Sequence, residues 1–524
     1  MNVFIFAIGG TGARVLRSLT FALASGIDNI PDGTNIIPLI IDYDKDNGDK
    51  VRTIKNLDNY LAIRQDAYNG VTLEGDERNF FHPRICHLSD VATIAGRPDI
   101  NVNPSFEFKF GLNDSTVAGT FASNIGYAEM IGQTSLTRDL LSSLYNDEPE
   151  DFPSGSHPFT ELNLDLGLGF KGNPNIGSIV FDNIRNDVEF RRFLNTFDPA
   201  QDRIFIIASI FGGTGSSGFP RIVDAVRYSG IHGFDNATMG ACVVMPYFKV
   251  NTPAGGAINS NIFNSKEKAA LSYYAQPDAN GQSLYNKLTS TYFVGDDNPT
   301  TLPYSEGSTG QVNDAHVVEF IAALSVLDFI CQTPQQIATN RFREFGMESM
   351  PEGTEKINFS HFDQATFDNY LQYLVAEAIS FKYYKDYVLT GKIPPKTSYY
   401  KTLNIAGKRS DVMYAKLKEF IDDFELWLDE MAVQNDGLKP FRHKPRDPNS
   451  QEPVSDDLID YFEGWNGCKS GTFNHNGTTF KDFTAFCDVI FKRIQNAWPN
   501  EEQVFLRTLY DASAEVFNLY TPNK

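Results

Sequence analysis

Two stretches of this chain share one design: a strand of buried character, a glycine-rich turn and then a helix. The first is "NVFIFAIGGTGARVL" at residues 2–16, and the second is "RIFIIASIFGGTGSSGFPRIV" at residues 203–223. Glycines at such a turn let the backbone approach a ligand closely, and the helix that follows presents its positive N-terminal end to an anion. One such turn is equally explained as a tight strand–helix joint. Two of them favour a phosphate-binding site more strongly than either turn alone.

The order of strand and helix signals in the first half predicts an α/β fold with a Rossmann-like parallel sheet. The helix after the first turn ends at Gly26, which suits a C-cap, and the strand "NIIPLIID" follows it. After the second turn come the strands "MGACVVMPYF" and "STYFVGDD", with a helix near residues 265–275 between them. Strands that alternate with helices in this way are typical of parallel sheets with helical crossovers.

We expect three parts along the chain: a nucleotide-binding domain over residues 1–312, a central helix over 313–332, and a second, mostly helical domain over 333–524. The segment at 313–332 is apolar nearly all round, which predicts burial between two layers. Residues 60–118 have an irregular pattern and residues 146–177 are rich in Pro, Gly, Asn and Ser, so both are interpreted as insertions.

Composition disfavours several classes of protein. The net charge of −21 argues against a general nucleic-acid binder, because a phosphate backbone would be repelled. The five cysteines are scattered and form no CxxC pair, so neither a disulfide framework nor a zinc site is expected. No apolar run reaches the roughly 18–20 residues of a membrane helix, and the start of the chain lacks a signal-peptide pattern. We therefore expect a cytoplasmic protein without a membrane span.

Neither common phosphate-binding motif fits the two turns. A dinucleotide fold needs a third glycine near Val15 to complete GxGxxG, and that glycine is absent. A Walker loop needs GK[ST] after four intervening residues, and no lysine stands there. An NAD-type oxidoreductase is therefore disfavoured.

The two turns resemble the tubulin/FtsZ superfamily. Its phosphate-binding signature is close to GGGTG[ST]G, and residues 211–217 read FGGTGSS, with Phe211 and Ser217 in place of glycines. The stretch "GGTGSSGFP" is similar to the bacterial form GGTGTGAAP, and "AIGGTGARVL" resembles the family's first nucleotide loop, GxGGxGxN. The resemblance covers roughly residues 1–385 and is strongest to divergent bacterial tubulin-like proteins.

The resemblance implies a site for GTP or GDP, with Mg²⁺ bridging phosphate oxygens. The phosphate contacts that it implies are Gly9, Gly10, Thr11, Gly12, Gly212, Gly213, Thr214, Gly215, Ser216 and Ser217. The family's γ-phosphate loop is expected at residues 124–133, where Gly126 supplies permissive backbone. Asp42 and Asp44 follow the second strand and are candidates for contacts to the waters of Mg²⁺, or equally for solvated turn residues.

Guanine recognition in the family comes from the strand before the central helix and from the first turns of that helix. The side chains in comparable places are Asp296, Asn298, Asn313 and His316. Oxygens of Asp and Asn suit the donor edge of guanine, and His316 is a candidate to stack on the base. Asn313 is equally explained as the N-cap of the central helix. Tyr247 and Phe248 match the loop after the fifth strand, where the family's ribose-binding Glu is missing.

Hydrolysis in tubulins and FtsZ is completed by a loop of the next subunit that resembles NxDxxD. Here "INFSHFDQ" offers Asn358 and Asp363 as catalytic candidates, with Ser360 in place of the first Asp. A serine cannot act as a carboxylate base at neutral pH. The same residues are also explained as a helix start, with Ser360 as the N-cap and Asp363 at the third position.

The resemblance therefore implies a tubulin-like GTP-binding protein that assembles head to tail into a filament, with slow hydrolysis of GTP completed between subunits. The alternative is a scaffold or regulatory protein that holds nucleotide without turnover and does not polymerise. In that case its helical C-terminal region would dock a protein partner.

Overall fold

A computed structural model gives the structure of the 524-residue chain. It describes residues 1–44, 46–68, 78–94, 104–108, 164, 166–253, 258, 260–305, 307–339, 342–343, 356–440 and 480–520. The γ-phosphate loop expected at residues 124–133, with Gly126, lies outside these residues. No helix in the described ranges is long and apolar enough to cross a membrane.

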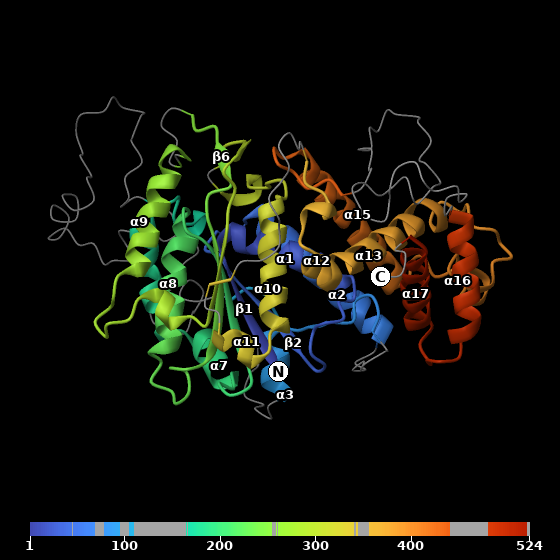
Figure 1. Cartoon of the computed structure of the whole chain (residues 1–524), viewed down its shortest axis with the longest axis horizontal. Coiled ribbons are helices and arrows are strands. Elements are labelled where there is room, and N and C mark those ends of the chain that lie inside the picture. Colours follow the sequence, from blue (N-terminus) through green and yellow to red (C-terminus); the bar gives the residue numbers. More distant parts are fainter. Residues whose placement is uncertain are drawn as a thin grey trace.

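A six-stranded parallel sheet forms the centre of the N-terminal part, in the order β3-β2-β1-β4-β5-β7 (Figure 1). The strands are β1 (Asn2–Ile8), β2 (Asn35–Ile41), β3 (Arg84–Ile85), β4 (Arg203–Ser209), β5 (Thr238–Val244) and β7 (Ser290–Val294). A small parallel pair joins β6 (Phe248–Val250) to β8 (Thr300–Leu302). This confirms the predicted α/β class with a Rossmann-like parallel sheet.

Helices cover both faces of the sheet, and β1 shows why. Its alternate residues Val3 and Ile5 belong to one apolar core, while Phe4 and Phe6 belong to the other. The first core includes α1 (Gly9–Ala24), α2 (Gly48–Tyr68) and α10 (Val317–Cys331). The second includes α3 (Leu88–Ile94), α6 (Pro174–Phe181), α7 (Val188–Thr196) and α8 (Gly213–Arg227). Burial on both faces explains why these strands are continuously apolar.

The connections carry further short helices. Beyond the sheet lie α9 (Phe263–Ala275) and α11 (Pro334–Thr339). Single helical turns are η3 (Leu166–Leu168), η4 (Asp182–Asn186), η5 (Ser260–Ile262), η6 (Leu284–Lys287), η7 (Ser308–Gly310) and η8 (Phe359–His361). The predicted end of the first helix is confirmed, because Gly26 has a φ of 76° and donates its N–H to Leu23 O.

Parts of both predicted insertions form regular elements of the fold. Residues 60–68 complete α2, because Tyr60 and Ile63 are buried in the first core. Residues 166–177 form η3 and the start of α6, which packs against α8. Gly177 is needed there, since a Cβ at this position would lie 2.1 Å from Ser217 Oγ. Close helix packing, and not a protruding loop, explains the small residues of this segment.

The central helix is buried nearly all round, as predicted, but begins later than residue 313. His316 is its N-cap: His316 Nδ1 accepts the N–H of Val318, and Glu319 Oε2 accepts the N–H of His316. The interpretation of Asn313 as the N-cap is therefore wrong. Asn313 Nδ2 instead donates a hydrogen bond to Asp49 Oδ2 on α2, at 2.9 Å.

The C-terminal region is mainly helical in its described residues, as predicted, and its helices lie beside α2, far from α8 and α9 (Figure 1). A continuous helical segment consists of α12 (Gln364–Thr366), the π-helical turn η9 (Phe367–Leu371), α13 (Gln372–Tyr383) and the π-helical turn η10 (Tyr384–Val388). It is followed by α14 (Ser398–Thr402), α15 (Val412–Val433), α16 (Phe480–Ile494) and α17 (Glu501–Tyr520). Because α15 packs on α1 and α2, the two halves share one apolar core.

Candidate functional site

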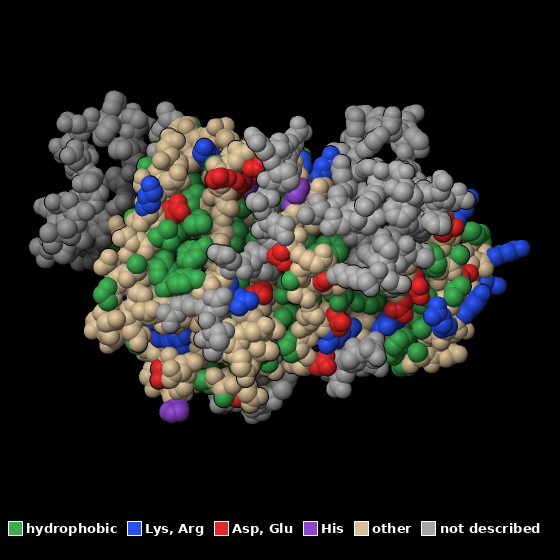
Figure 2. Space-filling model, viewed as in Figure 1, with side chains coloured by type: hydrophobic (Ala, Val, Ile, Leu, Met, Phe, Trp, Pro, Cys, Tyr) green, Lys and Arg blue, Asp and Glu red, His purple; other side chains and the backbone are tan. Residues whose placement is uncertain are grey.

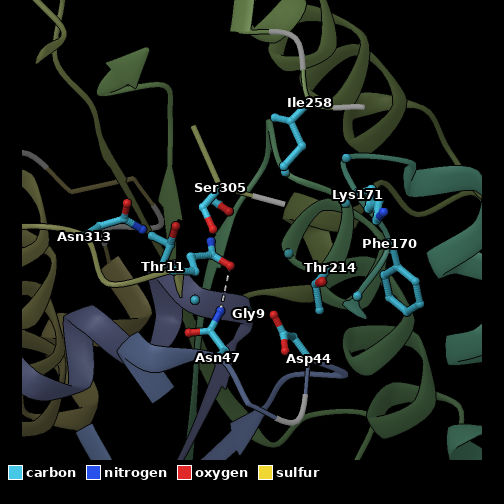
Figure 3. Close-up of a pocket in the computed structure, with 18 of the residues that line it drawn as sticks. Gly9, Thr11, Asp44, Asn47, Phe170, Lys171, Thr214, Ile258, Ser305 and Asn313 are labelled. Carbon is cyan, nitrogen blue, oxygen red and sulfur yellow. Dashed lines mark hydrogen bonds between the residues drawn. The ribbon is translucent and has the colours of Figure 1, made fainter. Parts of the chain in front are cut away.

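A cavity lies at the carboxyl ends of the parallel strands, where the first turns of α1 and α8 meet (Figure 3). A Cβ added to Gly9 would lie 3.4 Å from Thr214 Cβ, so the two glycine turns touch although they are far apart in sequence. Crevices at this edge are the usual ligand sites of open α/β sheets. Seven predicted phosphate contacts line the cavity: Gly9, Gly10, Thr11, Gly212, Gly213, Thr214 and Gly215.

The glycines of the first turn have different tasks. Gly9 has a φ of 72°, a left-handed conformation that favours glycine. Gly10 borders the cavity, and a Cβ there would come no nearer than 3.5 Å to another side chain. Gly12 is not among the lining residues, and a Cβ on it would lie 2.6 Å from the carbonyl carbon of Ala7. Gly12 therefore allows close packing of α1 on β1, and does not face a ligand.

The second turn shows the same division. A Cβ on Gly215 would lie 2.3 Å from Ser209 O, so this glycine seats α8 against the end of β4. Ser217 Oγ donates to Gly213 O at 2.6 Å, and Ser216 Oγ donates to Gly212 O. The two serine hydroxyls thus bond to the first turn of their own helix and do not line the cavity, unlike the contacts expected of them.

A third loop, missed in the sequence, completes this side of the cavity. Residues 169–172 (Gly-Phe-Lys-Gly) have left-handed backbone at Gly169, Lys171 and Gly172. A Cβ on Gly213 would lie 3.0 Å from the backbone nitrogens of Gly172 and Asn173, which puts this loop directly against the start of α8. Closely spaced glycines before Asn-Pro at a helix start were the available signal. The same residues also fit an inserted loop, because Pro, Gly, Asn and Ser are typical of both.

Two carboxylates, buried Asp44 and half-buried Asp42, border the same space. Asp42 and Asp44 follow β2, and Asp44 points toward the region between Gly9 and Thr214 (Figure 3). Burial raises the pKa of Asp42 to about 7, against the opposing charge of Lys50. No group of three or more metal-binding side chains occurs in the described part of the chain. Mg²⁺ is commonly held by one or two carboxylates together with phosphate oxygens, so this pair fits such an ion.

Part of the cavity lining is apolar and aromatic. It is formed by Phe211, Phe248, Val250, Ile258, Phe263 and Pro303. The ring centroid of Phe211 lies 5.5 Å from that of Phe248 and 5.0 Å from that of Phe263. The lining therefore combines the starts of two helices with apolar and aromatic side chains, which suits a ligand with an anionic and an aromatic part.

Polar side chains form the rim. Asn47 Nδ2 donates to Gln311 Oε1 at 2.9 Å beside Gly10 (Figure 3). Asn313 lines the cavity as expected of a base-binding residue, but its N–H and Nδ2 both donate to Asp49, at 3.1 and 2.9 Å. The amide oxygen of Asn313 and the second hydrogen on Nδ2 are therefore left for a ligand.

A buried cation, Arg14, stands at the base of the cavity and was not predicted. Its guanidinium is bonded to Asp49 at 2.9 Å, to Glu319 at 2.5 Å and to the hydroxyl of Tyr247. Asp49 also pairs with Arg52 at 2.8 Å, and Arg52 pairs with Glu430 of α15. The charge network therefore links the cavity to the C-terminal helices.

Asp296 and His316 are not brought to this cavity. They lie beside a second pocket, with His316 Nε2 3.5 Å from Asp296 Oδ2. Burial lowers the pKa of His316 to about 4, helped by the charge of Arg14. Tyr247 stands between this pair and Arg14, with its ring centroid 5.1 Å from that of His316.

The catalytic candidates Asn358 and Asp363 are also absent from the cavity lining. Asp363 is the N-cap of α12 and accepts the N–H of Thr366 at 2.8 Å and its hydroxyl at 2.9 Å. The expectation that Ser360 is the N-cap is therefore wrong. Phe362 packs on Phe320 in the first turn of α10, so this segment lies at the same end of the sheet as the cavity.

Comparisons with known proteins leave the family open. No protein-family model and no curated protein matches the sequence. Among solved structures, the chain is similar to a GTPγS-bound protofilament of CetZ2 from Haloferax volcanii, at 13% identity and a TM-score of 0.27. The match covers 63% of this chain and 58% of that chain, less than two thirds of its length. The likeness is distant, so the α/β assignment rests on the sheet itself.

Proposed function

We propose that the chain is a tubulin-like protein that binds GTP or GDP in the glycine-lined cavity. The observation that carries the proposal is the convergence of three glycine-bearing segments, at residues 9–12, 169–172 and 212–215, on one space. The helices α1 and α8 both begin there, so their unpaired N–H groups and positive ends face the same point. An anion with several oxygens is the ligand that such a site suits best.

The proposed orientation follows from the two kinds of residue that line the cavity. The phosphates would lie on the N-termini of α1 and α8 and on the loop at residues 169–172. Asp42 and Asp44 would hold Mg²⁺ or its waters, and the ion would offset phosphate charge. The base would lie toward Phe248 and the amide oxygen of Asn313, which accepts from the donor edge of guanine.

The test is nucleotide content and binding of the full chain. Purified protein is expected to release guanine nucleotide on denaturation, identified by chromatography, and to bind GTP more tightly than ATP in calorimetry. Gly10→Asp, which places a carboxylate in the cavity without a backbone clash, should weaken GTP binding at least 100-fold. The matched control is Gly310→Asp, which adds the same charge at an exposed position next to the rim. Absence of guanine-nucleotide binding, or equal binding by Gly10→Asp, would contradict the proposal.

Head-to-tail assembly with slow GTP hydrolysis is proposed as the consequence of binding, through contacts between unlike surfaces that repeat along a filament. Pelleting and electron microscopy with GTP and with GDP test it. A nucleotide-bound chain that stays monomeric would select the alternative, a scaffold or regulatory protein.

We propose that Asn358 and Asp363 act as catalytic residues on the nucleotide bound by a neighbouring copy of the chain. Asp363→Asn separates this role from capping, because Asn is as good an N-cap as Asp but carries no charge. A tenfold or larger fall in GTP turnover at unchanged melting temperature supports catalysis. Unchanged turnover would leave Asp363 as a helix cap alone.

A further inference from the structure

A lysine with left-handed backbone stands in the lining of the glycine-lined cavity. Lys171 has a φ of 43°, and in the described part of the chain only Phe81 and Asn404 are other non-glycine residues with positive φ. Gly169 and Gly172, on either side of it, adopt the same region at 76° and 79° without steric cost. In a lysine this conformation brings the Cβ close to the following carbonyl oxygen. Strained residues of this kind cluster at ligand sites, which directs attention to the side chain.

The loop that carries this lysine, residues 169–172, is fixed by three elements of the fold. Lys266 of α9 donates from Nζ to Gly172 O at 2.7 Å. A Cβ on Gly169 would lie 3.9 Å from the Cβ of Asp44, which follows β2. The loop also lies against the start of α8. It therefore stands between the candidate magnesium ligands and the positive end of a helix.

Lys171 lies away from the end of the cavity that is proposed for the base. In Figure 3, Lys171 and Asn313 stand at opposite sides of the cavity, with Thr11 and Thr214 between them. A nucleotide whose base lies toward Asn313 would therefore bring its outermost phosphate to the loop that carries Lys171. The flexible four-carbon stem of lysine lets its ammonium reach such a group.

A bound polyphosphate needs positive charge close to it. The chain as a whole has a net charge of −21, and on the face shown in Figure 2 the described Lys and Arg side chains are scattered among acidic ones. Among the described residues that line the cavity, the cations are Arg14 and Lys171. The charge of Arg14 is matched by Asp49 and Glu319. The position of Lys171 therefore suits it to compensate phosphate charge.

We propose that Lys171 selects a nucleoside triphosphate over a diphosphate by placing its ammonium on the outermost phosphate. The inference rests on the function proposed for the cavity and extends it, because it assigns the discrimination to one side chain. A diphosphate ends before this loop and gains less from the charge. A hydrogen bond between an ammonium and a phosphate oxygen is among the strong ones, which accounts for a lysine kept in left-handed backbone.

Calorimetric titration of the full chain with GTPγS, which is hydrolysed slowly, and with GDP tests the proposal at one Mg²⁺ concentration. The unmodified chain should bind GTPγS more tightly than GDP. Lys171→Gly should weaken GTPγS binding about tenfold or more and GDP binding about threefold or less, because one charged hydrogen bond is lost. Its melting temperature without nucleotide should not fall, since glycine adopts left-handed backbone without strain.

Two further variants separate charge from backbone. Lys171→Met keeps the stem without the charge and should lose the preference for GTPγS as Lys171→Gly does. Lys171→Arg keeps the charge and should retain the preference. These two comparisons hold even where glycine at this position lowers stability.

The matched controls are Lys268→Met, which removes a lysine charge from the exposed side of α9, and Asn404→Gly, which changes another left-handed residue. Both should keep the unmodified ratio of GTPγS to GDP affinity. An unchanged ratio in Lys171→Gly and Lys171→Met, or an equal loss in Lys268→Met, would overturn the assignment to Lys171 while leaving nucleotide binding intact. An unmodified chain that binds neither nucleotide would refute the proposed function itself, and this inference with it.

Discussion

The Nε atom of Arg14 lies 2.5 Å from Glu319 Oε1 and joins the first helix to the start of the central helix across 305 positions of sequence. Both side chains are buried, at 4% and 1% exposure, and Asp49 holds the same guanidinium from α2. Burial raises the pKa of Glu319, and the charge of Arg14 opposes that rise. Because none of the three groups has access to water, each depends on the others to compensate its charge.

Replacing Arg14 by methionine should therefore lower the free energy of unfolding by about 3–5 kcal/mol, because buried Glu319 loses its cation and Asp49 keeps only Arg52. Urea denaturation at pH 7 measures it. The double variant Arg14→Met with Glu319→Gln should recover part of the loss, since one of the orphaned charges is removed. An Arg14→Met chain as stable as the unmodified one would show that the ion pair contributes nothing.

Substitution by alanine should have opposite effects on stability at Gly12, which packs α1 on the sheet, and at Gly10, which lines the cavity. Gly12→Ala should destabilise the chain by about 1–3 kcal/mol, because the new Cβ would meet the backbone of Ala7 and push α1 off the sheet. Gly10→Ala should keep or raise stability by up to about 1 kcal/mol, because alanine favours a helix and its Cβ meets no backbone. Thermal melting of the two variants compares them directly. Equal loss in both would contradict the assignment of Gly12 to packing.

A buried acid in α13 predicts a pH effect. Both carboxyl oxygens of Glu377 are buried without a partner in the described chain, and burial raises its pKa well above the ordinary value. The folded chain therefore holds this proton more tightly than the unfolded chain. As a result, stability falls as the pH rises above about 4.5, the range in which the unfolded side chain ionises.

Glu377→Met should abolish this contribution. The variant is expected to be more stable than the unmodified chain at pH 8, by about 1–3 kcal/mol, with the difference shrinking toward pH 4.5. Urea denaturation at several pH values measures the slope. A variant with the same pH dependence as the unmodified chain would show that Glu377 does not titrate between these limits.

Much of the fold follows from local patterns in the sequence, and the site follows only in part. The apolar runs at β1 and β4 and the glycine turns after them predict the sheet and seven of the residues that line the cavity. The loop at residues 169–172 could not be predicted, because a glycine-rich stretch looks the same in the sequence whether it packs against a helix or forms an insertion.

Contacts across the chain explain the other differences. Asparagine is a common helix N-cap, yet the Nδ2 atom of Asn313 donates to Asp49, 264 positions away in the sequence. His316 caps the helix instead. Arg14 has no local signal at all, because only the fold brings its partners from α2 and α10 beside it. Pairings of this kind depend on the packing of helices and are not encoded in any short stretch.

The last prediction concerns the two halves of the chain. Trp427 of α15 is fully buried, its ring lies 5.0 Å from that of Phe21 and 5.4 Å from that of Phe320, and its Nε1 donates to Ser18 Oγ at 3.0 Å. The C-terminal region therefore forms one wall of the core that holds α1 in place.

Trp427→Ala should lower the free energy of unfolding by about 3–5 kcal/mol. Because the core is shared, we expect α1 and the C-terminal helices to lose protection together in hydrogen exchange. Trp498→Ala is the matched control: that side chain is only partly buried, stacks against Arg507, and should cost less than half as much. If residues 1–332 kept their protection while residues 356–440 unfolded in Trp427→Ala, the two parts would be independent domains, and α1 would not need α15.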